Sequence, residues 1–323
     1  MKKRILQVFL MAGFLTVSAV LAGCGKSSGD KELTIGYFNN VTHAQALYMK
    51  ATGSMEEVLP DGMKVNWTAF NAGPAEVEAL FAGDIDIGYI GPVPAVTANV
   101  KSKSDVKILS GVSKAGAVLV KSPESEIQSA ADLDGKTVAI PQIGNTQHLC
   151  LLKLLEDNGL SPADKGGTVN VTAVENADVM NMMDQGNIDA ALVPEPWGTT
   201  LEKNGAQIVL DYDEVYKGGD YPVAVVVVRS EFMEENPEAV EVFLAEHEKV
   251  TDYITANVPD ASAVVNKEIN DATGKSLDEA VLSGAFGKIV FTTDVNEDAI
   301  REFADISLEQ EFIMEDYKDI FVE

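Results

Sequence analysis

The chain has 323 residues, of which 24 are basic and 51 are acidic, so its formal net charge at pH 7 is -27. A negative field of this strength excludes nucleic acid as a partner and would repel the folded body from an anionic membrane surface. The length is sufficient for two domain-sized lobes, each with its own core. Cys24 and Cys150 are the only cysteines, and Cys150 lies in an apolar run as a small hydrophobic residue rather than a nucleophile.

The first 23 residues are typical of a signal peptide. Lys2, Lys3 and Arg4 precede an apolar run over 5–21 that is too short to span a membrane. The run closes with Leu21-Ala22-Gly23-Cys24, which resembles the bacterial lipobox, in which the cysteine is diacylated and becomes the new N-terminus. The alternative is an ordinary secretory peptide followed by a chance cysteine.

After removal of this leader, the mature chain would keep 21 basic and 51 acidic residues, a net charge of -30. We expect residues 24–31 to be a lipidated N-terminus and flexible tether that holds the protein at the outer face of the cytoplasmic membrane, or in the periplasm. Acylation of Cys24 would leave no second cysteine for a disulfide.

Residues 32–115 predict the first part of one α/β lobe. Alternating or β-branched stretches at 33–37, 65–70, 85–90 and 107–112 favour strands. Helices are expected at 44–51 and after Pro74, which suits a first helical turn.

Residues 116–221 predict a second lobe. A strand at 137–140 is followed by the polar turn 144–146 and by leucines at helical spacing. A strand at 169–174, a helix at 178–185 and strands at 189–193 and 208–210 complete this lobe.

Residues 222–323 are expected to return to the first lobe. PVAVVVVR, residues 222–229, reads as a fully buried strand. Helices are expected at 232–257, 261–270, 277–286 and 295–312, packing on the first lobe. The strand at 116–120 and the strand at 222–229 would cross between the lobes, with 113–116 and 218–222 as the hinge.

Two parts of the chain repeat one another. Residues 65–70 read VNWTAF and residues 169–174 read VNVTAV, an offset of 104 residues. The segment 83–86, GDID, is answered by 186–189, GNID, at an offset of 103. A period this long predicts two similar lobes of α/β class, each a mixed sheet flanked by helices. Asp86 and Asp189 recur in both copies, which favours a structural role for them.

Two such lobes joined by two strands leave a cleft, and ligands of open α/β sheets bind at the carboxyl ends of the strands. The polar turns that follow these strand ends should converge on the cleft. Several begin helices, whose unpaired N–H groups and dipoles favour a small anion. The candidate ligand-binding residues are Tyr37, Thr42, His43, Asn71, Gly73, Gly91, Pro92, Ser113, Asn145, Thr146, Gln147, His148, Glu195 and Trp197.

Five motifs extend this picture: the lipobox, AADLDGKTVAIP followed by GNTQH (130–148), AGDIDIGYIGP (82–92), DAALVPEPW (189–197) and RSEFMEENPEAV (229–240). Together they resemble the substrate-binding proteins of ABC importers in the nitrate, taurine and aliphatic sulfonate group. The resemblance covers the chain from Leu33 onward. It implies a two-lobed periplasmic-binding type II fold and a monomer that captures a small solute and delivers it to a membrane permease with its ATPase.

In that group the positions matching Thr42-His43, Gly73, Gly91-Pro92, 145–148 and Trp197 line the cleft. Taurine or an alkanesulfonate is the expected solute, with nitrate, bicarbonate or a pyrimidine precursor of thiamine as alternatives. Glu195 departs from the family pattern, because an acidic side chain is unexpected in a cleft that attracts anions. It could bind the ammonium group of a zwitterion, be neutralised by a neighbour such as Lys114, or indicate a ligand that is not a simple anion.

Other interpretations are weaker. A metal site of His43, His148 and Glu195 is disfavoured because the chain has three histidines and no His-rich loop, and we expect neither metal nor cofactor. Trp197 could be a core residue, as could Tyr37 or Tyr89. No catalytic motif is present, so an enzyme is not expected; a cytosolic pyrimidine synthase of this fold is excluded by the leader. A surface sensor that signals to a receptor would use the same cleft.

Overall fold

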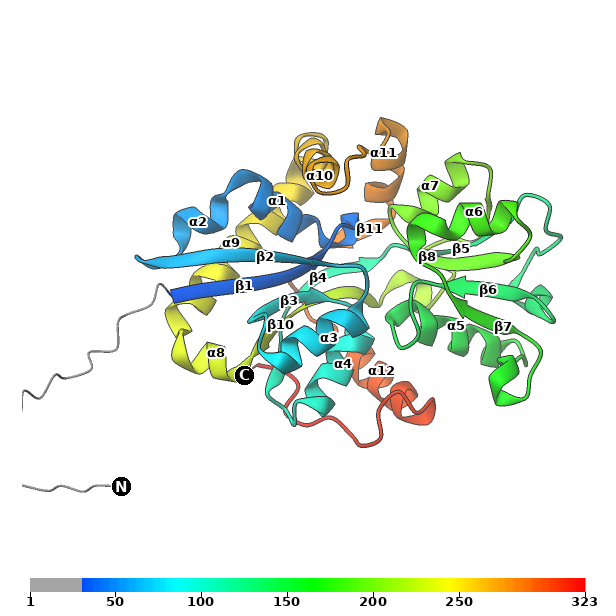
Figure 1. The fold of residues 1–323 in the computed structure, drawn as a ribbon, viewed down its shortest axis with the longest axis horizontal. Helices are drawn as coiled ribbons and strands as arrows, with labels where there is room; N and C mark the ends of the chain where they lie inside the picture. Colours follow the sequence, from blue (N-terminus) through cyan, green and yellow to red (C-terminus); the bar gives the residue numbers. More distant parts are fainter. Residues whose placement is uncertain (1–30, 323) are drawn as a thin grey trace, which may run out of the picture.

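The computed structural model describes residues 31–322, so the predicted signal peptide, Cys24 and most of the tether lie outside the described residues. Within this range two sheets form two lobes side by side (Figure 1). Lobe 1 is built on a six-stranded sheet with the order β11-β4-β10-β3-β1-β2. Lobe 2 is built on a five-stranded sheet with the order β7-β6-β8-β5-β9. The fold is therefore the predicted two-lobed α/β architecture.

The strands of lobe 1 are β1 (Lys31–Phe38), β2 (Met63–Phe70), β3 (Ile87–Ile90), β4 (Val106–Ala115), β10 (Pro222–Arg229) and β11 (Ile289–Phe291). Those of lobe 2 are β5 (Ala117–Lys121), β6 (Thr137–Ile140), β7 (Asn170–Ala173), β8 (Ala190–Pro194) and β9 (Gln207–Leu210). Helices flank both sheets because the strands within each lobe run mostly parallel and need crossover connections.

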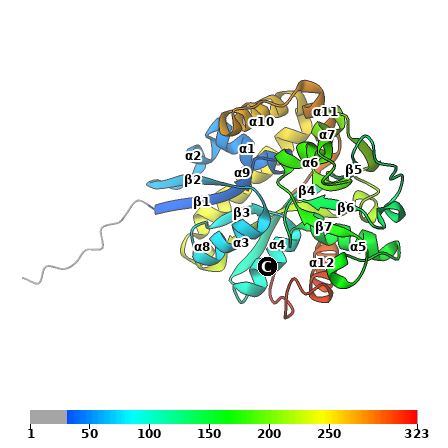
Figure 2. The same cartoon turned by 45° about the vertical axis from the view of Figure 1, so that its right-hand side comes forward.

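The helices of lobe 1 are α1 (Ala44–Thr52), α2 (Ser54–Val58), α3 (Gly73–Ala82), α4 (Pro92–Lys101), α8 (Ser230–Glu235), α9 (Pro237–Ala256) and α10 (Val258–Thr273). Lobe 2 carries α5 (Thr146–Asp157), α6 (Val179–Asp184) and α7 (Trp197–Lys203). Two later helices, α11 (Glu279–Gly287) and α12 (Glu297–Glu309), lie where the lobes meet. Both views place α11 beside α7 of lobe 2 (Figures 1 and 2).

The duplication predicted from the sequence is confirmed in the strand pairing. In lobe 1, β1 pairs in parallel with β2 and β3, and in lobe 2, β6 pairs in parallel with β7 and β8. The backbone N–H of Thr34 donates to Asp86 Oδ2 at 2.9 Å, and that of Thr137 donates to Asp189 Oδ2 at 2.8 Å. The two aspartates therefore do the same structural work, which is to tie the start of one strand to the start of its neighbour.

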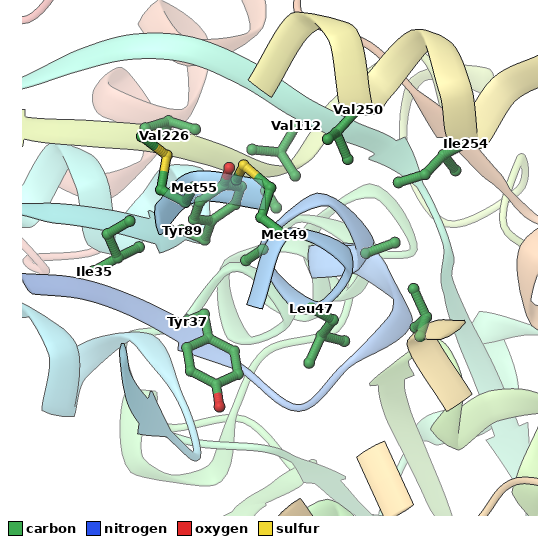
Figure 3. Close-up of a cluster of buried hydrophobic side chains, with 14 of the residues drawn as sticks. Ile35, Tyr37, Leu47, Met49, Met55, Tyr89, Val112, Val226, Val250 and Ile254 are labelled. Carbon is green, nitrogen blue, oxygen red and sulfur yellow. The ribbon is translucent and has the colours of Figure 1, made fainter. Parts of the chain in front are cut away.

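The larger core cluster lies in lobe 1, between its sheet and α1, α9 and α10. Figure 3 shows Ile35 and Tyr89 from the sheet against Leu47 and Met49 of α1. Tyr37 belongs to the same cluster and is almost completely buried. Both tyrosines that the sequence left undecided thus face this core.

Two connections run between the lobes. β4 passes into β5 through Ala115 and Gly116, which both have left-handed backbone angles, φ 60° and φ 76°. The second connection runs from β9 to β10 over 211–221. The backbone N–H of Ala115 donates to the Tyr221 carbonyl oxygen at 3.1 Å, so the two connections are tied together where they cross.

The C-terminal helices differ from the prediction in two ways. The single helix expected over 232–257 is two helices, because Pro237 has no backbone N–H and Asn236 before it is non-helical, with φ -134° and ψ 53°. The last helix does not pack on lobe 1 alone. Ile300 of α12 joins a lobe 1 core cluster, and Phe303 joins the core of lobe 2.

No helix within residues 31–322 combines the length and the apolar character needed to cross a membrane.

Candidate functional site

A small cavity lies between the lobes, at the carboxyl ends of the strands of both sheets. Its volume is ≈ 30 Å³, room for about two water molecules. The residues around it come from both lobes, and they are Phe38, Asn40, Thr42, His43, Asn71, Ala72, Gly73, Gly91, Pro94, Pro141, Asn145, Thr146, Gln147, Asn176, Pro194 and Val223.

Most of this lining consists of pairs that the duplication relates at the offset of 103 residues. Each pair places one residue from each lobe on the cavity, and the pairs are Phe38 with Pro141, Thr42 with Asn145, His43 with Thr146, Gly73 with Asn176, and Gly91 with Pro194. The cavity is therefore the place where the equivalent corners of the two lobes face each other.

Helix N-termini aim at the cavity from both sides. Asn145 caps α5, since its side chain accepts from the backbone N–H of His148 at 2.8 Å. Thr146 and Gln147, the first two residues of α5, have backbone N–H groups that precede the first intrahelical donor. Gly73 opens α3 and Gly91 is the N-cap of α4. These partial positive charges make the cavity suitable for one small anion.

The lobes touch across the cavity. A Cβ on Gly91 of lobe 1 would lie 2.5 Å from Thr146 Oγ1 of lobe 2, so only glycine fits at this position. Trp197 of lobe 2 donates from Nε1 to Asn40 Oδ1 of lobe 1 at 3.0 Å. Thr146 Oγ1 is buried and has no hydrogen-bond partner among residues 31–322. The lobes are thus in contact at the cavity, where one buried hydroxyl has no partner among the described residues.

No Asp, Glu, Lys or Arg is among the described residues that line the cavity. The titratable side chain there is His43, and complete burial lowers its pKa to about 3. Its Nδ1 accepts from the backbone N–H of Phe38 at 3.2 Å. His43 is therefore neutral near pH 7, and the lining carries hydrogen-bonding groups without formal charge.

Of the candidate residues, eight lie on the cavity: Thr42, His43, Asn71, Gly73, Gly91, Asn145, Thr146 and Gln147. The other six lie elsewhere. Tyr37 is in the lobe 1 core, and Pro92 is the first residue of α4. Ser113 donates to the Thr42 carbonyl oxygen at 2.9 Å, behind the lining.

His148 and Trp197 flank the cavity without lining it. His148 stacks on Phe312 with ring centroids 4.9 Å apart and accepts from the backbone N–H of Gly144 at 3.1 Å. Burial lowers its pKa to about 4. Trp197 reaches the lining only through its hydrogen bond to Asn40.

Glu195 is completely buried next to the lining residue Pro194, and its carboxylate is engaged by residues that do not line the cavity. It accepts from the backbone N–H of Thr199 at 3.1 Å and lies 3.4 Å from Lys288 Nζ, which comes from lobe 1. Burial raises the pKa of Glu195, and Lys288 opposes that shift. Lys114, the neighbour considered from the sequence, pairs with Asp220 at 3.1 Å instead.

Sequence reasoning missed half of the lining, namely Phe38, Asn40, Ala72, Pro94, Pro141, Asn176, Pro194 and Val223. The offset between the two repeated parts of the chain could have predicted some of these residues. Adding 103 to the candidates Gly73 and Gly91 gives Asn176 and Pro194. Val223 and Asn40 carried no such signal, because Val223 reads only as a buried strand and Asn40 as part of a turn.

Residues 26–269 match the model of the NMT1-like family. The chain belongs to this family. It is 31% identical over 230 residues to a taurine-binding periplasmic protein of Escherichia coli, which covers 71% of this chain and 68% of the relative. A putative aliphatic sulfonates-binding protein of Escherichia coli is 31% identical over 219 residues, or 66% of this chain and 65% of the relative.

A solved structure shares the fold of this chain. The alkanesulfonate-binding protein SsuA from Xanthomonas axonopodis, bound to MOPS, superposes with a TM-score of 0.72 at 21% identity, covering 87% of this chain and 93% of that one. At this identity the likeness establishes the two-lobed fold of the NMT1-like chain and nothing about its ligand.

Proposed function

We propose that the protein is the extracytoplasmic solute-binding component of an ABC importer and captures a small sulfonate, taurine or an alkanesulfonate, between its lobes. The observation that carries the proposal is the cavity formed by equivalent corners of the duplicated lobes, with helix N-termini directed at it. Relatives at 31% identity that are named for taurine and aliphatic sulfonates support the choice of solute.

Capture would proceed by closure of the lobes on the solute. The sulfonate oxygens accept hydrogen bonds from the N–H groups at the start of α5 and from the Thr146 hydroxyl, and the rest of the solute contacts the apolar lining, which includes Phe38 and Val223. Ala115 and Gly116, in their left-handed conformation, lie where β4 passes from one lobe to the other and would absorb the rotation.

The role is binding rather than catalysis. The histidine on the cavity is neutral, and its Nδ1 accepts from the backbone N–H of Phe38. The relatives at 31% identity are named as binding proteins. The closed form would be recognised by a permease coupled to an ATPase, and a lipid on Cys24 would hold the protein, as a monomer, at the outer face of the membrane.

The proposal is tested by thermal shift and calorimetry on the mature chain, with ethanesulfonate, taurine, nitrate, bicarbonate and an aminopyrimidine. A ligand of the folded state raises the melting temperature with the logarithm of its concentration. We expect a sulfonate to give the largest shift. Thr146→Val, which removes only the unpaired hydroxyl, should weaken binding by about 10-fold, with an unchanged melting temperature of the free protein. A response to nitrate, bicarbonate or the aminopyrimidine alone would refute the sulfonate assignment.

A further inference from the structure

The charges around the cavity bear on which sulfonates it accepts. The lining holds four asparagines, one glutamine and two threonines but, among the described residues, no acidic side chain. Ligand oxygens therefore meet oriented N–H and O–H donors, which stabilise a single negative charge. A ligand ammonium group would meet amide and carbonyl oxygens but no opposite charge, and a buried charge without a partner is strongly disfavoured.

The acid next to the lining residue Pro194 is already engaged. Glu195 receives the Lys288 ammonium at 3.4 Å, and Thr199 donates to it from both its backbone N–H and its hydroxyl, at 3.1 and 3.0 Å. Neither Thr199 nor Lys288 is among the residues that line the cavity. If Glu195 turned to serve a ligand, Lys288, whose side chain is 15% exposed, would lose its buried carboxylate partner and would keep the Thr199 hydroxyl at 3.4 Å and the Glu202 carboxylate at 3.8 Å.

We infer that the cavity selects monoanionic sulfonates without an amino group and discriminates against taurine, because its lining holds no carboxylate among the described residues and Glu195, next to the lining residue Pro194, neutralises Lys288 of the opposite lobe. This inference rests on the proposed function and narrows it. Glu195 is in this view a positioning residue: it joins α7 to the segment that carries Lys288 and so stabilises the closed form, without contact to the solute.

The test uses ligands that differ by one group. Taurine is ethanesulfonate with an added ammonium, and 2-hydroxyethanesulfonate carries a neutral polar group at the same place. Calorimetry at pH 7 should show ethanesulfonate and 2-hydroxyethanesulfonate binding at least about 10-fold more tightly than taurine. At a pH above the pKa of its amine, taurine should bind with an affinity close to that of 2-hydroxyethanesulfonate. The affinity for ethanesulfonate at the same pH serves as the control for any change in the protein. Equal or tighter binding of taurine at pH 7 would overturn the inference, whereas no binding of any of the three would instead refute the proposed function.

Two variants add independent readouts. Glu195→Gln should weaken the binding of ethanesulfonate and of taurine by the same factor, since the lost contact is with Lys288. A loss of affinity for taurine alone would place the acid at the ammonium group and would contradict the inference. Asn176→Asp, which introduces a carboxylate on the cavity, should shift the preference toward taurine by about 10-fold or more. Asn187→Asp adds the same charge to lobe 2 at an exposed position and should leave the preference unchanged.

Discussion

The two lobes share one plan but differ in how the centre of each sheet is packed. In lobe 1, Gly36 of β1 lies opposite Gly88 of β3, and the side chain of Glu76 from α3 fills the space above both. In lobe 2 the equivalent positions, 103 residues later, are Ala139, Ala191 and Val179, which pack in an apolar cluster. A buried carboxyl and two glycines thus stand in one lobe where a valine and two alanines stand in the other.

Glu76 is an unusual core residue. It is completely buried, and neither carboxyl oxygen has a hydrogen-bond partner within residues 31–322. Burial raises its pKa well above the ordinary value of 4.5, because the charged form would be buried without a partner. α3 also brings Gly73 to the cavity. The helix that lines the cavity in lobe 1 is therefore anchored by a buried, unpaired carboxyl, whereas its counterpart α6 in lobe 2 is anchored by the apolar side chain of Val179.

The largest effect is expected where the lobes meet. Gly91→Leu would place a side chain on Thr146 and hold the lobes apart, and we expect at least about 100-fold weaker sulfonate binding. Calorimetry measures the loss, and thermal unfolding of the free protein checks that the fold persists. Gly287→Leu, at a glycine with no atoms near its Cβ position, is the control. Full affinity in Gly91→Leu would mean that closure at this corner is not required.

The packing difference between the lobes can be tested by substitution at the centre of the lobe 1 sheet. A Cβ on Gly88 would lie 2.6 Å from Glu76 Oε1, so Gly88→Ala should lower the free energy of unfolding by about 1–3 kcal/mol. Glu76→Val in the same chain reproduces part of the lobe 2 arrangement and should restore most of that loss. Urea unfolding of both variants and the wild type measures it. If the losses of unfolding free energy from the two substitutions simply added in the double variant, the proposed equivalence between the sheet centres of lobes 1 and 2 would be contradicted.

The same carboxyl predicts how stability depends on pH. The folded state keeps the Glu76 proton at pH values where the unfolded state has released it, so its contribution to the free energy of unfolding is complete below pH 4.5 and falls as pH rises toward the folded pKa, by about 1.4 kcal/mol per pH unit at most. Glu76→Val should therefore gain stability relative to wild type as pH rises from 5 upward. Parallel stability curves for the two proteins would show that Glu76 does not titrate in this way.

A smaller effect is expected at the tryptophan between the lobes. Trp197→Phe removes the hydrogen bond to Asn40 and should weaken solute binding by about 3- to 10-fold, near 1 kcal/mol. Trp67→Phe, in β2 of lobe 1 and away from the cavity, is the matched control and should bind normally. The ligand-induced change in tryptophan fluorescence should disappear only in Trp197→Phe. If it persists there, Trp197 does not report closure.

The sequence predicted what depends on local pattern and on the repeat. The order of strands and helices, the capped start of α5 and the paired roles of Asp86 and Asp189 follow from alternation, turn residues and the offset between copies. What could not be predicted depends on contacts between distant positions. Nothing in the sequence pairs Glu195 with Lys288, and Glu76, flanked by Ala75 and Val77, has the pattern of an ordinary residue of an amphipathic helix.

The position of α12 has a consequence for biosynthesis. Ile300 and Ala304 pack into lobe 1, while Phe303 and Ile306 on the adjacent face pack into lobe 2. Neither lobe can finish burying its apolar interior until these late residues have left the ribosome, although lobe 2 itself ends far earlier in the chain. Because both cores draw on this last helix, we expect a chain that stops before residue 297 to leave apolar surface exposed in both lobes.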